Sequence, residues 1–203
     1  MPLSPRGLTL TSITLYGPKV SLITVGPAGE MSVCSACIAC TDMEGRPSRM
    51  SGRGGLGAVM GAKGLKAIVL AYTRSRVTPA DEGLFRSAIK EYHQVLLAAP
   101  TTETYATYGT AAMLDKLNAM GRLPTRNFSR GKFEKAEEIN GARLREVILE
   151  RGGEGNPTHG CMPGCVIRCS NIYPDAGGKT IVAPLEYETI GLLGSNCGIG
   201  DLV

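Results

Sequence analysis

The sequence predicts an α+β chain, rich in strands at first and mainly helical afterwards. Two observations predict this division. Short β-branched and apolar runs bounded by Gly and Pro fill the first part of the chain. Beyond about residue 76, apolar residues recur at helical spacing instead. We therefore expect two domains, covering residues 1–76 and 77–203.

Two strands are expected in the first domain. Val20–Val25 is a β-rich run that leads into a Gly-Pro turn, and residues 65–72 form a second apolar run. Residues 34–41, which are small and apolar, predict a packed strand or a short helix.

Helical patterns follow in the second domain. The segment Pro79-Ala-Asp81 resembles a helix start, and apolar spacing extends the helix over residues 84–97. Further helices are expected over residues 110–120 and 140–151, each followed by glycine. Residues 184–193 predict the start of a fourth helix.

Composition excludes several classes of protein. The formal net charge of +4 is too small to indicate nucleic-acid binding. No apolar run approaches the ~20 residues of a membrane span, and the first residues do not form a signal peptide. Seven cysteines without an export signal favour a reducing, cytoplasmic compartment. Clustered cysteines in such a compartment indicate metal or redox chemistry.

A glycine-rich basic stretch runs from Arg49 to Lys66. Closely spaced glycines let backbone N–H groups approach an anion, and Arg49 and Arg53 can bind phosphate. A helix over residues 58–63 would point its N-terminus at the same anion. The stretch matches neither a Walker loop nor a dinucleotide fingerprint. A tightly turned structural loop is the alternative, and both interpretations stay open.

The first of two cysteine groups consists of Cys34, Cys37 and Cys40. Two residues separate neighbouring cysteines, as in bacterial cluster motifs. The residues between them are small or apolar, and no Cys-Pro follows. We therefore expect buried thiols without a metal.

The second group, Cys161, Cys165 and Cys169, lies in a segment with Gly and Pro between the thiols. Three thiolates on such a loop can converge on one iron–sulfur cluster. The fourth ligand would be Cys197 or a cysteine from elsewhere. Zinc is the rival metal, with His159 as a further ligand.

Together these motifs resemble one family. The run Gly-Arg-Gly-Gly-Leu-Gly-Ala-Val-Met-Gly-Ala-Lys-Gly-Leu-Lys-Ala-Ile-Val from Gly52 is similar to the pterin-binding segment of aldehyde ferredoxin oxidoreductases. The order and spacing match from about Val25 to the end, whereas residues 1–19 fit poorly. The other matching segments are Gly26-Pro-Ala-Gly-Glu30, Leu123-Pro-Thr-Arg-Asn-Phe128, the second cysteine group, Pro184-Leu-Glu-Tyr-Glu-Thr189 and Leu193-Gly-Ser-Asn-Cys-Gly198.

The resemblance implies a tungsten or molybdenum ion held by two pterins, with a 4Fe–4S cluster beside one of them. Such an enzyme oxidises a small aldehyde, or a related oxo substrate, to a carboxylic acid and passes electrons to ferredoxin or another acceptor. Residues 1–76 would end a β-rich pterin-binding domain, and residues 77–203 would begin a helical domain that holds the cluster. We thus expect an internal piece of a longer protein, inactive alone, with room for a homodimer at full length.

Matching positions also imply site residues. Cys161 and Cys165 match cluster ligands, but the family's first cluster cysteine falls at Thr158, so Cys169 is expected to substitute. The expected pterin contacts are Arg49, Met50, Gly52 and Arg53.

Two carboxylates are candidates for catalysis. Glu188 matches a carboxylate near the metal, suited to proton transfer or to activating a water, and Glu186 is the second choice. On the residues alone, both are explained as charges at a helix N-terminus. Three other interpretations of the whole chain stay open: an accessory iron–sulfur electron-transfer protein, a zinc-stabilised binding module, and an unfolded remnant.

Overall fold

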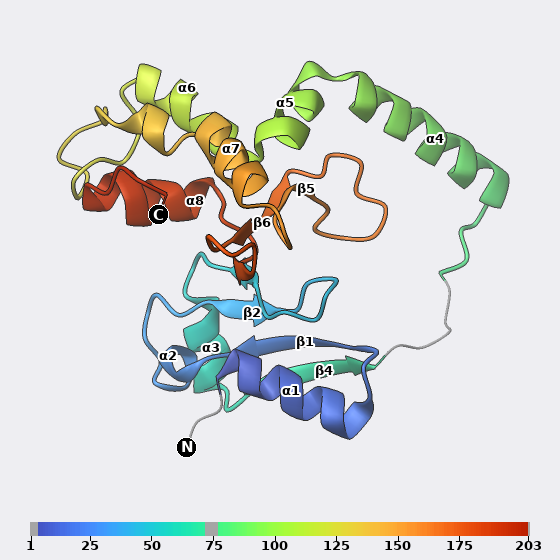
Figure 1. Cartoon of the computed structure of the whole chain (residues 1–203). Helices are drawn as coiled ribbons and strands as arrows, with labels where there is room; N and C mark the ends of the chain where they lie inside the picture. Colours follow the sequence, from blue (N-terminus) through green and yellow to red (C-terminus); the bar gives the residue numbers. More distant parts are fainter. Residues whose placement is uncertain (1–3, 72–76, 203) are drawn as a thin grey trace. The chain divides into compact units, whose positions relative to one another are not determined.

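The computed structural model describes residues 4–71 and 77–202. The chain forms two compact units, Met1–Thr78 and Pro79–Val203 (Figure 1). The boundary expected at residue 76 lies outside the described residues. Helices and strands occur in both units, which confirms the α+β class.

The first unit contains a four-stranded antiparallel sheet in the order β3-β2-β1-β4. The strand expected over Val20–Val25 is confirmed with the same bounds, and residues 34–41 contain a strand as one of the two expected alternatives. The second expected strand is also present, although residue 72 lies outside the described residues. The strands are β1 (Val20–Val25), β2 (Ile38–Cys40), β3 (Arg49–Ser51) and β4 (Ala67–Ala71).

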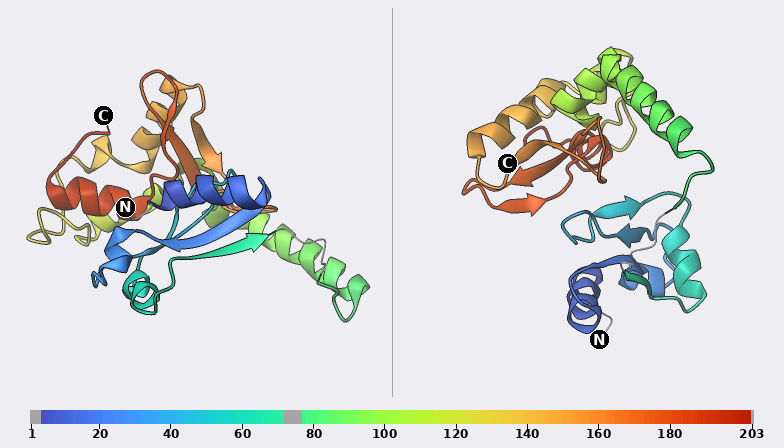
Figure 2. Two further views of the ribbon diagram at one scale, coloured as in Figure 1. Left: turned by 90° about the horizontal axis from the view of Figure 1, so that it is seen from below. Right: turned by 90° about the vertical axis from the view of Figure 1, so that its right-hand side faces the viewer.

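The first unit also has an unexpected helix, α1 (Pro5–Tyr16), which lies along β1 (Figures 1 and 2). Its β-branched residues have modest helix propensity and mask the pattern. The signal is at its start, where the Ser4 hydroxyl accepts a hydrogen bond from the Gly7 N–H at 3.2 Å and Pro5 follows. Serine before proline is a common helix beginning.

Glycines allow two short helices, α2 (Pro27–Glu30) and α3 (Leu56–Ala62), to pack closely. A Cβ added to Gly61 would lie 1.9 Å from the Gly29 carbonyl oxygen, and one on Gly57 would lie 2.4 Å from the Cys37 oxygen. These two glycines therefore serve packing. Gly52 differs, because a Cβ there would meet nothing within 4 Å.

The helices expected in the second unit are present. Asp81 caps the first of them, accepting from the Leu84 N–H at 2.8 Å, and Asn140 caps α7, accepting from the Arg143 N–H at 2.9 Å. Residues 184–193 become helical only from Tyr187 onward. The elements are α4 (Glu82–Ala98), α5 (Pro100–Tyr108), η1 (Thr110–Ala112), α6 (Met113–Ala119), η2 (Ala136–Glu138), α7 (Gly141–Arg151), α8 (Tyr187–Thr189), the π turn η3 (Ile190–Gly194) and η4 (Ser195–Cys197).

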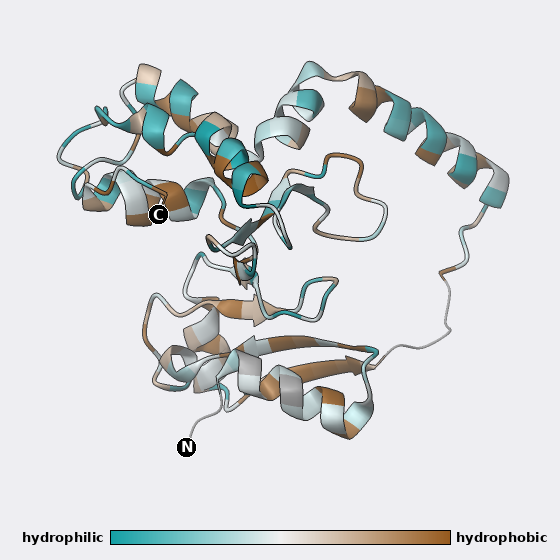
Figure 3. Cartoon of the chain, in the orientation of Figure 1, coloured by the Kyte–Doolittle hydropathy of each residue, from teal (hydrophilic) through white to brown (hydrophobic). Residues whose placement is uncertain are grey.

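A three-stranded antiparallel sheet in the second unit was not expected. It consists of β5 (Asn156–His159), β6 (Ser170–Pro174) and β7 (Thr180–Val182), with β6 in the middle. The apolar core includes Leu114, Phe133 and Leu144. Most apolar residues of α4 are exposed, and Figure 3 shows hydrophobic positions along this helix. The connection from β5 to β6 holds the second cysteine group, so this sheet positions the cysteines.

Replacing Gly61 by alanine should destabilise the first unit, because the new methyl group would overlap the Gly29 carbonyl. Overpacking of this kind costs about 1–3 kcal/mol or more. Urea unfolding followed by circular dichroism measures the change. Gly52→Ala is the matched control and should leave the free energy of unfolding almost unchanged; equal stability of the two variants would contradict the packing argument.

Candidate functional site

The cysteine loop, residues 160–169, places three thiols near one another. Cys161 is exposed, whereas Cys165 and Cys169 are half-buried. All three cysteines lie in the single connection between β5 and β6. The loop thus gathers the cysteines that the sequence singled out.

Arg168 connects the end of this loop to the strand that precedes it. Its guanidinium Nη2 donates to the Thr158 carbonyl oxygen at 3.0 Å, and its backbone N–H donates to Cys165 Sγ at 3.5 Å. The N–H bond is the main reason that the pKa of the Cys165 thiol lies below its ordinary value. A lowered pKa favours the thiolate, which is the form that binds metal.

Cys169 has the opposite shift. Burial raises its pKa first, and the nearby charges of Glu186, Cys161 and Cys165 raise it further. The Glu186 carboxylate therefore contributes negative charge at this end of the loop, which would favour a bound cation. Within residues 4–71 and 77–202, however, no three His, Cys, Asp or Glu side chains are arranged as ligands of a single metal ion.

The other suggested ligands lie in different surroundings. His159 is only 6% exposed and pairs with Ser170 across β5 and β6, so it is packed in the sheet. Cys197 is exposed on η4, where its thiol donates to the Leu192 carbonyl at 3.3 Å.

The two candidate carboxylates differ sharply. Glu188 is exposed in the first turn of α8. Glu186 precedes this helix and is held by hydroxyl groups: Thr110 donates to Oε2 at 3.0 Å, and Ser170 donates to Oε1 at 3.1 Å. Ser170 directly follows Cys169, so Glu186 reaches the end of the cysteine loop.

A second link reinforces this connection. The buried Asn171 amide donates to the Leu185 carbonyl at 2.7 Å and accepts from the Leu185 N–H at 3.0 Å. The Thr110 hydroxyl also accepts from the Tyr187 N–H at 3.0 Å, which satisfies a donor of the first turn of α8. Hence β6, η1 and the start of α8 are fixed together.

The segment expected to bind pterin begins on β3, which lies at an edge of its sheet within the described part of the chain. Arg49 pairs with Cys40 and Met50 with Ala39, so the side chains of Arg49 and Met50 point to opposite faces. Arg53 follows in the exposed turn.

Asp42 organises the connection between β2 and β3. Its carboxylate accepts from the Arg46 N–H at 2.8 Å, from Arg46 Nε at 2.6 Å and from the Ser48 hydroxyl at 3.0 Å. Burial alone would raise the pKa of Asp42, but the hydrogen bonds from Arg46 and Ser48 outweigh burial and lower it. Asp42 therefore fixes the chain just before Arg49, and sequence analysis missed it.

The first cysteine group corrects an expectation. Cys34 is exposed, and Cys37 and Cys40 are only half-buried, so the prediction of buried thiols is wrong. The Cys34 and Cys37 carbonyl oxygens lie against the glycine-rich segment. Because the backbone of the cysteine-containing stretch makes this contact, the cysteine side chains need not be buried. The Cys37 thiol lies 3.8 Å from the Met50 sulfur.

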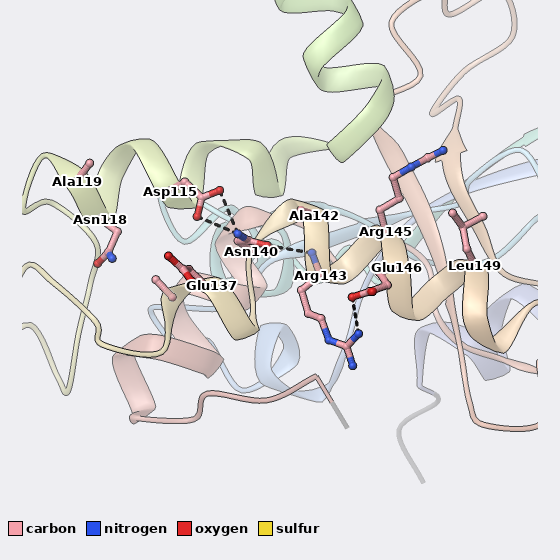
Figure 4. Close-up of a pocket in the computed structure, with 11 residues that line it drawn as sticks. Asp115, Asn118, Ala119, Glu137, Asn140, Ala142, Arg143, Arg145, Glu146 and Leu149 are labelled. Carbon is pink, nitrogen blue, oxygen red and sulfur yellow. Dashed lines mark hydrogen bonds and ion pairs between the residues drawn. The ribbon is translucent and has the colours of Figure 1, made fainter.

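An open pocket between α6 and α7 lies apart from these residues (Figure 4). Asn140 Nδ2 donates to both Asp115 oxygens, at 3.1 and 3.2 Å, and Arg143 pairs with Glu146 at 2.5 Å. The pocket contains none of the residues that the sequence singled out as site residues.

The fold and the two motif regions define a class of chain in which a strand-rich unit precedes a unit with a cysteine loop. Residues 9–72 match the family model described as aldehyde ferredoxin oxidoreductase, N-terminal domain, and residues 87–203 match the model for domains 2 and 3. The chain belongs to the aldehyde ferredoxin oxidoreductase family. The first match begins at residue 9, so the expectation that residues 1–19 fit the family poorly is wrong for most of that segment.

The chain is similar to relatives with the name tungsten-containing aldehyde ferredoxin oxidoreductase. The chain is 39% identical to the one from Pyrococcus abyssi and 38% identical to the one from Pyrococcus horikoshii, over 90% of this chain in both cases. It spans 28% of the length of either relative.

A solved structure, the active site complex BamBC of benzoyl coenzyme A reductase with 1,5-dienoyl-CoA, has a similar fold. The TM-score is 0.56 at 17% identity, over 98% of this chain and 32% of that one. In the described part of the chain, no helix is both long and apolar enough to span a membrane.

Replacing Asp42 by asparagine should cost about 1–3 kcal/mol of folding stability, because Arg46 and Ser48 lose a charged acceptor. Since the folded-state pKa of Asp42 is lowered, its contribution is present above about pH 4 and is lost as the pH falls through the folded-state value. Urea unfolding between pH 3 and 7 should show this loss in the unmodified chain.

The asparagine variant should lack that component of the pH dependence. Glu44→Gln is the control, because the Glu44 carboxylate meets Arg46 near the surface and such pairs contribute about 0–1 kcal/mol. An unchanged pH profile in the asparagine variant would contradict the assignment.

Proposed function

We propose that this chain is the part of an aldehyde-oxidising tungsten or molybdenum oxidoreductase that joins the pterin site to a 4Fe–4S cluster. The observation that carries the proposal is the cysteine loop, which holds three cysteines and whose end is bonded through Ser170 to Glu186, two residues before Glu188. Names of the relatives support the metal and the substrate class.

The cysteine loop has donor chemistry suited to a cluster. Cys161, Cys165 and Cys169 supply three sulfur ligands, and the Arg168 N–H bond to Cys165 is of the kind that stabilises cluster sulfurs. The fourth ligand would come from another cysteine. A Gly- and Pro-containing loop can close the remaining distance when metal binds, because short metal-binding segments often order with their metal.

The edge of β3 suits a pterin with its phosphates. Gly52 is exposed, has an ordinary φ and has open space around it, so neither packing nor backbone conformation requires glycine there. A glycine in such a place leaves room for a ligand to approach the backbone. Arg49 and Arg53 would bind phosphate or ring edges, and Met50 would contact the ligand from the other face of β3.

The proposed reaction converts an aldehyde and water into a carboxylic acid, two protons and two electrons. When bound, the tungsten or molybdenum pterin would supply the two-electron acceptor, and the cluster would lead the electrons to ferredoxin or another acceptor. Glu188, exposed at the start of α8, is the group proposed to take up a proton from the attacking water. Glu186 is the second candidate for that role.

The complete protein is proposed to act in the cytoplasm, where an oxygen-sensitive cluster and reduced thiols persist. Homodimer formation at full length is also a proposal. Neither a nucleic acid nor a membrane span is part of the proposal, and aldehyde is proposed as a substrate class.

Anaerobic reconstitution of the chain with iron and sulfide tests the cluster. We expect a broad brown absorbance with about four irons per chain, lost in Cys165→Ala and kept in Cys34→Ala as the matched control. Metal analysis and visible spectroscopy measure both. One zinc per chain without colour would instead support a zinc-stabilised module, and iron without pterin in the complete protein would support an accessory electron-transfer protein.

Replacing Arg53 by alanine should reduce pterin retention about tenfold, because a charge-assisted bond to phosphate is lost. The measurement is the fluorescence of oxidised pterin released from protein made in a host that synthesises the cofactor. Arg86→Ala, on exposed α4, is the control and should retain pterin normally. Equal retention in both variants would argue against Arg53 as a phosphate ligand.

A further inference from the structure

The segment Pro184–Thr189 contains two glutamates that the sequence cannot tell apart. Their surroundings separate them, because Glu188 is exposed whereas Glu186 is held through both carboxylate oxygens. A carboxylate that moves protons needs access to water or substrate. One that accepts hydroxyl hydrogen bonds from two elements is suited to holding those elements in place.

We propose that Glu186 is a positioning residue, which fixes the end of the cysteine loop against η1 and the start of α8. Ser170 follows Cys169 directly, so the bond from the Ser170 hydroxyl to Glu186 restrains the backbone beside that thiol. On the other side, the bond from Thr110 ties the same carboxylate to η1. The role in holding a cluster rests on the proposed function, whereas the restraint on Cys169 does not.

Neighbouring hydrogen bonds reinforce this restraint on the backbone beside Cys169. The Asn171 amide pairs with the Leu185 backbone through two hydrogen bonds, next to the bond between Ser170 and Glu186. Consecutive residues of β6 are thereby joined to consecutive residues before α8. Cys169 is consequently placed at a fixed distance from the helix that presents Glu188.

The proposal depends on hydrogen bonds and does not require the negative charge. Glutamine has the same shape and one remaining oxygen acceptor, and hydroxyl groups can donate or accept. Thr110 and Ser170 can therefore rotate their hydroxyl hydrogens to pair with a glutamine amide. Alanine removes both acceptors and leaves these hydroxyls without that partner.

The test is the alkylation rate of Cys169 by iodoacetamide in the metal-free chain, read by peptide mass spectrometry. Glu186→Ala and Glu186→Gln remove the charge equally, so the difference between them reports the hydrogen bonds together with the packing of the side chain. Thr110→Val, which keeps the shape of threonine, isolates the contribution of one hydroxyl. We expect Cys169 to react about tenfold faster in the alanine variant than in the glutamine variant, because the loop opens more often. Glu188→Gln should match the unmodified chain, and Cys197 gives the internal reference rate.

A second pair of variants covers the case in which Glu186→Ala does not fold. Thr110→Val should speed alkylation of Cys169, whereas Thr110→Ser, which keeps the hydroxyl, should not. Equal rates in the alanine and glutamine variants of Glu186, or in the two Thr110 variants if alanine does not fold, would overturn the proposal. Iron reconstitution of the same proteins is scored separately, so loss of all iron binding with the expected alkylation rates would reject the cluster and keep the positioning role.

Discussion

The hydrogen bonds from Thr110 and Ser170 to Glu186 connect the parts of the second unit that matter for chemistry. Without them, the end of the cysteine loop and the start of α8 would be joined mainly through the Asn171 amide. Together with the Asn171 amide, this carboxylate links the placement of Cys169 to that of Glu188. In the proposed positioning role, this coupling depends on hydrogen-bond geometry and does not require the charge.

Glycine serves two purposes in the first unit. Gly57 and Gly61 permit contacts that any side chain would block, so they set the position of α3 against α2 and the cysteine-containing segment. Gly52 is free of such contacts and is proposed to leave room for a ligand beside β3. Asp42 completes the arrangement by fixing the turn before Arg49. Gly57 and Gly61 thus serve packing, whereas Gly52 is proposed to serve ligand access.

Local signals made much of the fold predictable. The caps Asp81 and Asn140 and the apolar run of β1 act over a few residues, so the sequence shows them directly. The sheet around β6 was missed because its strands are short, polar and interrupted by turns, and only pairing with distant segments stabilises them. In the candidate site, the cysteine loop was recognisable from spacing. The different surroundings of Glu186 and Glu188 were not, because Thr110 lies 76 residues from its carboxylate partner.

We propose that the complete protein holds a 4Fe–4S cluster through the cysteine loop found in this chain. The most direct measurement is the metal content of the complete protein, purified without oxygen and without added metals, compared with the same protein carrying Cys161→Ser. We expect about four irons per tungsten or molybdenum, with iron lost in the variant. One zinc per chain in place of iron, or iron unaffected by the substitution, would contradict it.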